Sequence, residues 1–324
     1  MKVVEDVSLK PYNTFGLEAR AARLAELSPD DDPHCVDAFS QELFVLGAGS
    51  DVVFSADYRG TVLRLSPVQQ AVAVGERVTA WGGMTMDDLV QWTVDRGLYG
   101  LENLSAIPGT VGAAVVQNVG AYGVEAKDVV ESIEVYDMQR RELCNVAAAE
   151  CGFAYRDSLF KRCAGHYLVL RVTFRLRRQY VPVLAYKALA ALPHDTAQQM
   201  RDAITDLRWQ KLPRPEQYGS VGSFFKNPVV SETVYLRLRE ACPDMPEAHP
   251  TPDGRHKLSA GWLIDHAGWK GRTRGGAGVW PHNALVLYNN GSCTAAEVLS
   301  LAAEITADVE DKYGVTLTPE AIIV

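Results

Sequence analysis

Two glycine-rich segments are the places where this chain is best suited to hold a ligand with its backbone. Residues 100–123 read GLENLSAIPGTVGAAVVQNVGAYG, and a shorter turn at 47–51, GAGSD, follows the apolar run 43–46. Glycine lets a ligand approach the main chain closely, and N–H groups in turns form concavities that attract phosphate. We therefore predict that the two segments together hold a phosphorylated cofactor.

Neither segment fits the common nucleotide-binding motifs. In a G-x-G-x-x-G fingerprint that starts at Gly47, the third glycine would stand at position 52, which is Val52. No Gly-Lys-Ser/Thr follows either segment, so the phosphate loop of nucleotide hydrolases is excluded as well. A tight turn without a ligand remains open, mainly for 47–51.

Three side chains outside the glycine segments are candidates for proton transfer or anion binding. Arg156 lies in FAYRDS, Ser223 in GSVGSFFKNP, and Glu320 follows Pro319 near the C-terminus. By residue type alone, Arg156 also suits a surface ion pair, Ser223 a turn, and Glu320 a solvated position. No serine stands in a G-x-S-x-G elbow, which disfavours a serine hydrolase.

Composition excludes several classes of partner. The chain has 324 residues, 47% hydrophobic and 22% charged, which is typical of a globular protein with about two domains. A net charge of -8 argues against nucleic-acid binding, which needs a basic face. No apolar run is long enough for membrane insertion, and the histidines lack ligand spacing, so we expect a cytoplasmic protein with no metal site.

The elements that must position these residues follow from periodicity and capping signals. Period-two alternation of apolar residues from Leu168 to Leu176 predicts a strand. Thr85 with Asp88, and Thr294 with Glu297, are capping signals for two helices. Strands are predicted at 43–46, 61–65, 71–74, 77–81, 132–136, 167–176 and 284–288. Helices are predicted from 85 to 97, 195 to 211, 231 to 241, 259 to 267 and 294 to 314. Residues 100–123 and 242–256 are predicted to be loops, and the fold class is α+β.

These segments together resemble one family, the UDP-N-acetylenolpyruvoylglucosamine reductases (MurB), flavoproteins of bacterial cell-wall synthesis. The resemblance is carried by 13–16, 46–50, 58–61, 100–104, 107–112, 117–123, 155–158, 222–228, 260–265 and 319–320. It implies a two-part FAD-binding domain of the vanillyl-alcohol-oxidase type, followed by an α+β substrate-binding domain. We expect the two halves at 1–66 and 67–195, and the substrate domain at 196–324.

The resemblance also implies the cofactor and the reaction. In this family NADPH reduces a non-covalent FAD, and hydride then passes to the enolpyruvyl ether of a UDP-sugar to give UDP-N-acetylmuramate. The FAD contacts are expected from Gly47, Ala48, Gly49, Ser50, Asp51, Pro108, Gly109, Thr110, Gly112, Ala113, Asn118, Gly120, Ala121 and Gly123.

Roles for single side chains are carried over in the same way. The resemblance assigns Arg156 and Glu320 to the substrate carboxylate and makes Ser223 the residue that protonates carbon. Substrate contacts are expected from Tyr122, Tyr186, Arg208, Lys211 and Asn227. Tyr186 resembles the tyrosine of a mobile loop that covers the substrate in the longer type of the family, and we expect a monomer.

Three residues depart from the family pattern. Asp51 stands where Asn is common, Val115 where Pro is usual, and Ile322 where some members carry Arg. Two alternatives remain open from the sequence: another FAD-dependent oxidase or dehydrogenase of the same fold, and a non-catalytic sensor of nucleotide sugars.

Overall fold

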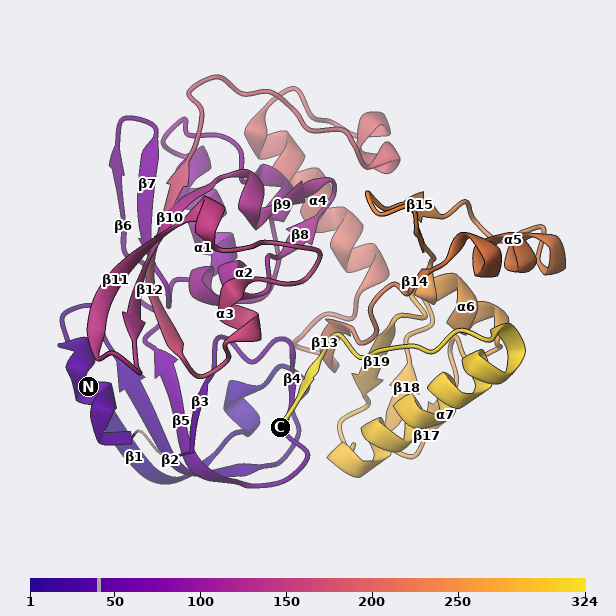
Figure 1. The fold of residues 1–324 in the computed structure, drawn as a ribbon, viewed down its shortest axis with the longest axis horizontal. Coiled ribbons are helices and arrows are strands. Elements are labelled where there is room, and N and C mark those ends of the chain that lie inside the picture. Colours follow the sequence, from indigo (N-terminus) through magenta and orange to yellow (C-terminus); the bar gives the residue numbers. More distant parts are fainter. Residues whose placement is uncertain (40–41) are drawn as a thin grey trace. The chain divides into compact units, whose positions relative to one another are not determined.

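A computed structural model describes residues 1–39 and 42–324 and divides them into two compact units (Figure 1). Unit 1 consists of Met1–Val7, Ala21–Gly49 and Tyr58–Arg208. Unit 2 consists of Ser8–Arg20, Ser50–Asp57 and Trp209–Val324. The two N-terminal segments of unit 2 interrupt unit 1 in the chain. The domain limits 66/67 and 195/196 stay a prediction, since the compact units divide the chain at other places.

Unit 1 contains two main sheets and a short hairpin. A four-stranded sheet has the order β1-β2-β5-β3, with β1 Lys2–Ser8, β2 Arg20–Leu27, β3 Leu43–Val45 and β5 Tyr58–Leu65. A five-stranded antiparallel sheet has the order β11-β10-β12-β7-β6, with β6 Ala71–Val74, β7 Arg77–Trp81, β10 Val130–Asp137, β11 Glu142–Ala147 and β12 Tyr167–Arg175. The hairpin consists of β8 Gly120–Ala121 and β9 Val124–Glu125.

Strand β12 confirms the predicted strand, but its alternate apolar residues do not all lie on one face. Its pairing with β10 shifts between Glu134 opposite Arg171 and Val135 opposite Val169, which leaves Leu170 as the extra residue of a β-bulge. A bulge moves the side chains beyond it to the other face of the sheet. Leu168 and Leu170 accordingly belong to a cluster shared with the four-stranded sheet, whereas Val172, Phe174 and Leu176 belong to a cluster shared with helices.

The helices of unit 1 begin at side-chain caps. They are α1 Met86–Val94, α2 Val111–Val116, α3 Leu159–Arg162 and α4 Ala197–Lys211, the last crossing from Arg208 of unit 1 to Trp209 of unit 2. Thr85 caps α1 as predicted, because its hydroxyl accepts from the amide of Asp88 at 3.1 Å. Helix α2 was not predicted. It lies inside the glycine segment 100–123 and packs with α1 against the five-stranded sheet (Figure 1).

Unit 2 is built on short strands. The four-stranded sheet has the order β13-β19-β18-β17, with β13 Gly219–Ser223, β17 Thr273–Arg274, β18 Ala277–Val279 and β19 Val286–Asn289. A second sheet is β14-β16-β15, with β14 Val229–Val230, β15 His249–Pro250 and β16 His256–Lys257, inside and beside the predicted loop 242–256. A parallel pair joins β4 Val52–Val53 to β20 Ile322–Ile323.

Three helices cover the core of unit 2, namely α5 Glu232–Ala241, α6 Ala260–His266 and α7 Ala295–Tyr313. Helix α7 confirms its prediction at both ends: Thr294 and Glu297 form a capping box, and Gly314 ends the helix in the left-handed conformation with φ 64°. Its buried residues Val298, Leu301, Ala302, Ile305 and Val309 lie in one cluster with Phe224 and Phe225. The 3-10 helices of the chain are η1 Lys10–Tyr12, η2 Pro33–Phe39, η3 Glu102–Leu104, η4 Ala126–Asp128, η5 Ala148–Glu150 and η6 Lys187–Ala191.

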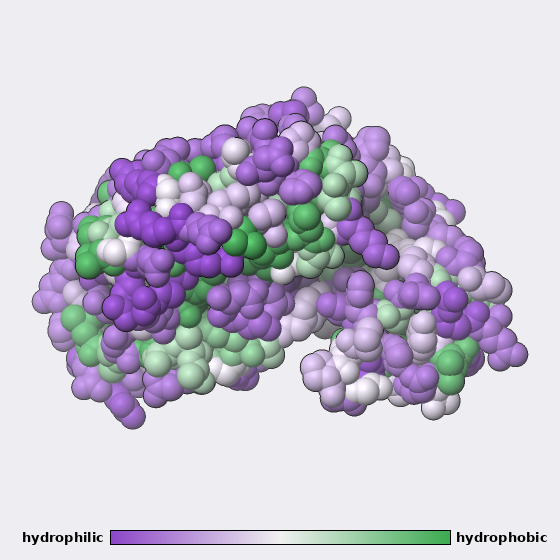
Figure 2. Space-filling model, turned by 90° about the horizontal axis from the view of Figure 1, so that it is seen from above, coloured by the Kyte–Doolittle hydropathy of each residue, from purple (hydrophilic) through white to green (hydrophobic). Residues whose placement is uncertain are grey.

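The molecular surface is mainly hydrophilic on the face that Figure 2 shows, with apolar residues in separate patches. Within residues 1–39 and 42–324, no helix combines the length and apolarity that a membrane span requires. The same residues contain no group of three or more His, Cys, Asp and Glu side chains placed to hold a metal ion.

Candidate active site

The two glycine-rich segments meet in unit 1. A Cβ atom added to Gly47 would lie 2.8 Å from the Cβ of Ala113 and 3.3 Å from Oγ1 of Thr110. The turn after β3 therefore lies directly against the start of α2, with no room for a side chain. Among the described residues, the amides of Gly47 and Ala48 find no hydrogen-bond acceptor. They are available to a ligand, as a phosphate-binding turn requires.

Local interactions explain why α2 starts at this point. Thr110 is the N-cap, and its hydroxyl accepts from the amide of Ala113 at 3.2 Å. A Cβ on Gly112 would approach the carbonyl oxygen of Gly82 to 3.2 Å, so glycine lets α2 pack closely on the chain beyond β7. Gly109, with φ 138°, adopts a backbone conformation that other residues rarely take. Val115, which stands where the family usually has Pro, is a residue of α2 whose side chain is fully buried in the core.

Arg156 lies beside the hairpin that ends the long glycine segment. Its Nη2 atom donates to the carbonyl oxygen of Gly120 at 2.8 Å. Asn118, buried and with φ 45°, donates from Nδ2 to the carbonyl of Ala154 at 2.8 Å. The 154–158 turn is fixed further by Ser158, whose buried hydroxyl donates to the carbonyl of Val116 at 2.7 Å. The arginine thus stands next to residues predicted to contact the cofactor.

Three of the predicted substrate contacts also gather in unit 1. The rings of Tyr122 and Tyr186 meet edge to face with centroids 5.1 Å apart. Arg208 donates from Nε to the carbonyl of Ala106 at 3.0 Å, and it is close enough to Tyr122 to interact with its hydroxyl electrostatically. Burial lowers the pKa of Arg208 and raises the pKa of Tyr122, while the contact between them partly offsets both shifts.

Asn103 connects these groups to the rest of unit 1, and no pattern in the sequence marks it for this role. Its Nδ2 atom donates to the carbonyl of Tyr122 at 2.8 Å and to the carbonyl of Val183 at 3.0 Å. The buried side-chain amide of Asn103 therefore holds both the glycine segment, at Tyr122, and the chain just before Tyr186, at Val183.

Ser223 and Glu320 lie on neighbouring backbone segments of unit 2. The amide of Glu320 donates to the carbonyl of Phe224 at 2.7 Å, and the amide of Lys226 donates to the carbonyl of Thr318 at 2.9 Å. The half-buried Ser223 ends β13, and its hydroxyl makes no hydrogen bond with any residue that the structure describes. This hydroxyl is therefore not committed to holding the fold together.

The N-terminal motif 13–16 supports the strand that carries Ser223. The hydroxyl of Thr14 donates to the carbonyl of Ser220 at 2.6 Å, and Nδ2 of Asn289 donates to the carbonyl of Phe15 at 2.9 Å. A Cβ on Gly219 would fall 2.1 Å from the Phe15 carbonyl oxygen, so the first position of β13 requires glycine. These contacts explain why the segment Ser8–Arg20 belongs to unit 2.

The C-terminal segment with Glu320 is anchored on both sides. Beyond Glu320, the amide of Ile322 donates to the carbonyl of Asp51 at 2.9 Å, and β20 pairs with β4. The boundary between the two units falls inside the first glycine turn, after Gly49. Ser50 and Asp51 belong to unit 2, and Asp51 directly precedes β4, which pairs with the C-terminal strand β20.

The remaining predicted residues are distributed as follows. Oδ1 of Asn227 accepts from the amide of Ala260 at 3.0 Å, which uses this oxygen to hold the start of α6. Lys211 is the exposed last residue of α4 and belongs to unit 2. Ser223 and Glu320 are thus brought together in unit 2, while Arg156 belongs to unit 1 with the glycine segments.

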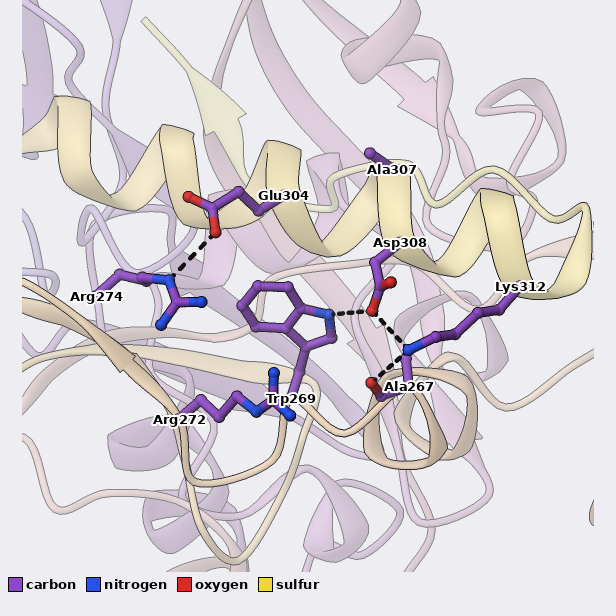
Figure 3. Close-up of a pocket in the computed structure, with 8 residues that line it drawn as sticks. All are labelled: Ala267, Trp269, Arg272, Arg274, Glu304, Ala307, Asp308 and Lys312. Carbon is purple, nitrogen blue, oxygen red and sulfur yellow. Dashed lines mark hydrogen bonds and ion pairs between the residues drawn. The ribbon is translucent and has the colours of Figure 1, made fainter.

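A hollow of about 540 Å³ in unit 2 contains none of the predicted site residues. Figure 3 shows its lining, with Nε1 of Trp269 donating to Asp308 at 2.8 Å and Arg274 paired with Glu304 at 3.3 Å. Lys312 is also paired with Asp308, at 3.0 Å. Because the lining contains none of the residues predicted to bind cofactor or substrate, the hollow is not part of the candidate active site.

Comparisons with known proteins agree with this arrangement. The profile described as FAD binding domain matches residues 34–142, which include both glycine segments. The profile described as UDP-N-acetylenolpyruvoylglucosamine reductase, C-terminal domain, matches residues 214–324, which include Ser223 and Glu320. The expected fold, an FAD-binding part followed by an α+β C-terminal part, is confirmed.

Whole-chain relatives extend the match. A UDP-N-acetylenolpyruvoylglucosamine reductase of Azoarcus sp. is 43% identical, over 100% of this chain and 98% of the relative. The enzyme of the same name from Pseudomonas aeruginosa is 44% identical, over 99% and 98%. The crystal structure of UDP-N-acetylenolpyruvylglucosamine reductase (MurB) from Thermus caldophilus is similar with a TM-score of 0.71 and 26% identity, over 100% of this chain and 99% of that chain. Since the likeness runs from end to end at this level of identity, the chain belongs to the UDP-N-acetylenolpyruvoylglucosamine reductase family.

Proposed function

We propose that this protein is an NADPH-dependent flavoenzyme that reduces the enolpyruvyl group of UDP-N-acetylglucosamine enolpyruvate to give UDP-N-acetylmuramate, a precursor of peptidoglycan. Family membership supports the reductase activity and its FAD and NADPH requirement. The observation that carries the proposal is the backbone hydrogen bond between the segments of Ser223, the proposed proton donor, and Glu320, the proposed carboxyl group.

The glycine segments suit FAD in this structure. Gly47 packs against Thr110 and Ala113 without room for a side chain, and the Gly47 and Ala48 amides are available to phosphate oxygens. The cofactor contacts that we propose are those predicted from the sequence, namely Gly47, Ala48, Gly49, Ser50, Asp51, Pro108, Gly109, Thr110, Gly112, Ala113, Asn118, Gly120, Ala121 and Gly123. Bound at these residues, FAD would supply the hydride chemistry between NADPH and the enolpyruvyl group.

Arg156 is proposed to bind the substrate carboxylate. Addition of hydride to the β-carbon spreads negative charge from the α-carbon onto that carboxylate, as an enediolate. A guanidinium offers a planar fork of donors that matches both carboxylate oxygens and stabilises charge where it develops. The bond from Nη2 to the Gly120 carbonyl holds the guanidinium in orientation before substrate arrives.

Ser223 is proposed to deliver the proton to the α-carbon. A serine hydroxyl is a weak acid, but a carbanion-like α-carbon is a strong base, so transfer over hydrogen-bond distance is feasible. Glu320 is proposed to act on the same enediolate through a hydrogen bond.

Binding of the UDP-sugar is proposed to use the two clusters described above. Arg208 and Lys211 are suited to the diphosphate, Tyr122 and Tyr186 to covering the substrate, and Asn227 to a polar contact through its amide nitrogen. Part of this proposal is that Tyr186 marks the longer type of the family, and that a C-terminal substrate domain begins near residue 196. We also propose that the protein acts in the cytoplasm, where NADPH is supplied, and as a monomer.

A two-step colour test examines the proposed function. The purified protein should be yellow from bound FAD, lose the colour with NADPH under anaerobic conditions, and regain it only when the enolpyruvyl UDP-sugar is added. If the yellow colour returned when the oxidised form of a simple alcohol or lactone substrate was added, and not with the enolpyruvyl UDP-sugar, another flavin oxidoreductase would be favoured. A protein that binds the UDP-sugar but carries no flavin would favour a sensor.

Gly47→Ala should weaken FAD binding, because the new methyl group would meet Ala113 and Thr110. Overpacking of this kind costs roughly 1–3 kcal/mol, which corresponds to about 5- to 150-fold in the dissociation constant of FAD. Titration of the apoprotein with FAD measures this constant. Gly261→Ala in α6 is the matched control, since its Cβ would meet nothing closer than 3.4 Å. Equal FAD affinity in Gly47→Ala and wild type would remove the 47–51 turn from the cofactor site.

A further inference from the structure

Arg208 is half-buried, and the carboxylate of Asp87, which interacts with it electrostatically, is already engaged. It donates to the Ala106 carbonyl and interacts electrostatically with Tyr122, and among the described residues no carboxylate forms an ion pair with it. Asp87 is close enough to influence Arg208 electrostatically, but its two oxygens are held by Arg201. The charge of Arg208 therefore remains available to an anionic ligand.

Asp87 and Arg201 form a two-pronged ion pair between α1 and α4. Nη1 of Arg201 lies 2.5 Å from Oδ1 of Asp87, and Nη2 lies 2.8 Å from Oδ2. Arg201 also donates from Nε to Oε1 of Gln91 at 2.7 Å, so its guanidinium is fixed from two sides. Burial opposes the charge on Asp87, but hydrogen bonds from Arg201 and the Ala106 amide prevail and keep the pKa of Asp87 below its ordinary value.

Ala106 connects this ion pair to Arg208. Its amide donates to Oδ1 of Asp87 at 2.6 Å, and its carbonyl oxygen accepts from Nε of Arg208 at 3.0 Å. Ala106 has φ 54°, a left-handed conformation that is unfavourable for a residue with a Cβ. The Asp87 carboxylate stabilises that conformation, and the orientation of the carbonyl toward Arg208 depends on it.

From this chain of contacts we propose that Asp87, clamped by Arg201, is a positioning residue that orients the Arg208 guanidinium for the diphosphate of the UDP-sugar through the peptide of Ala106. The inference rests on the proposed function, because it takes Arg208 as a diphosphate contact. Arg201 and Asp87 are far apart in the sequence and carry no motif, so neither could be assigned this role before the fold was known.

The direction in which loss of the Asp87 charge changes diphosphate affinity makes the inference testable. If Asp87 acted on the ligand only through its charge, its removal would strengthen diphosphate binding, since one negative charge near the site would disappear. If Asp87 positions Arg208, its removal must weaken diphosphate binding despite the loss of that negative charge. The two interpretations therefore predict changes of opposite sign.

The experiment measures the dissociation constant of UDP for the FAD-loaded protein by calorimetry. Asp87→Asn should raise this constant roughly tenfold, the order found when an outer partner of a ligand-holding residue is removed. FAD content and the rate of flavin reduction by NADPH should stay within about twofold. Asp206→Asn is the matched control, because Asp206 is an exposed carboxylate on α4 near Arg208 in sequence but on a different side of the helix. It should leave the constant unchanged or slightly lower.

A double-mutant cycle separates positioning from a general structural effect. In an Arg208→Gln background, Asp87→Asn should cause no further loss of UDP affinity, because the residue through which it acts is absent. Arg201→Gln should reproduce the loss caused by Asp87→Asn, and it serves as the second variant if Asp87→Asn folds poorly.

Three results would overturn the inference: tighter or unchanged UDP binding in Asp87→Asn, losses that simply add in the double variant, or no effect of Arg208→Gln. The last would also remove Arg208 from the diphosphate site. The colour test would still report reductase activity in that case, so failure of the inference is distinguishable from failure of the proposed function.

Discussion

Replacing Ser223 by alanine should slow turnover by about 10²- to 10⁴-fold, the usual contribution of a positioned general acid. The loss should appear only in the half-reaction with the enolpyruvyl UDP-sugar, because proton delivery to the α-carbon belongs to that step. Reduction of the bound flavin by NADPH should keep its wild-type rate. Rapid-mixing absorbance measurements follow the two half-reactions separately.

The structure supports a specific effect of this substitution. The Ser223 hydroxyl makes no hydrogen bond with the described residues, so its removal should leave the free energy of unfolding nearly unchanged. Ser220→Ala on the same strand β13 is the matched control and should be fully active. If Ser223→Ala turned over at the wild-type rate, the proton would have to come from another group.

Replacing Arg156 by lysine should reduce turnover by about 10²- to 10³-fold, the range for loss of one donor to a developing negative charge. An ammonium group cannot form two parallel hydrogen bonds with a carboxylate. It would also lose the orientation given by the bond between Arg156 and the Gly120 carbonyl. The measurement is kcat and KM for the enolpyruvyl UDP-sugar, with the greater change expected in kcat.

Arg162→Lys is the control for this variant. Arg162 lies in α3, six residues further along the chain, and its guanidinium is paired with Asp157 at the surface. Surface pairs contribute little, so near-normal activity is expected. Near-normal activity of Arg156→Lys itself would show that the substrate carboxylate is bound elsewhere.

Helices with strong local signals could be predicted from the sequence. In α7 the capping box of Thr294 and Glu297, the apolar face and the terminal Gly314 all act within a few residues of one another. Such features need no tertiary context, and the structure reproduces them. The same holds for α1 and for the hairpin of β6 and β7 across Gly75, where a positive φ is required.

Features that depend on distant partners could not be predicted. Helix α2 forms in a glycine-rich segment because Thr110 caps it and the chain at Gly82 packs against Gly112, and no single segment contains both causes. The bulge at Leu170 arises from pairing with β10, so the period-two pattern of β12 gave no sign that the apolar face changes side.

In the candidate site too, some features could be predicted from the sequence and others depend on distant partners. The glycine segments were recognisable by composition alone, whereas Arg156, Ser223 and Glu320 became distinguishable from ordinary surface residues only through the family resemblance. The pairing of the Glu320 amide with the Phe224 carbonyl joins residues remote in the sequence. The links through Asp87, Arg201 and Asn103 are likewise visible only in three dimensions.

A crystal structure of the oxidised, FAD-loaded protein with the enolpyruvyl UDP-sugar tests the central claim most directly, because the oxidised enzyme cannot consume this substrate. The account predicts the Ser223 hydroxyl about 3–3.5 Å from the α-carbon, a reactive separation, with the Arg156 guanidinium on the carboxylate and the isoalloxazine ring against the β-carbon. Ser223 or Arg156 directed away from the enolpyruvyl group in that complex would contradict it.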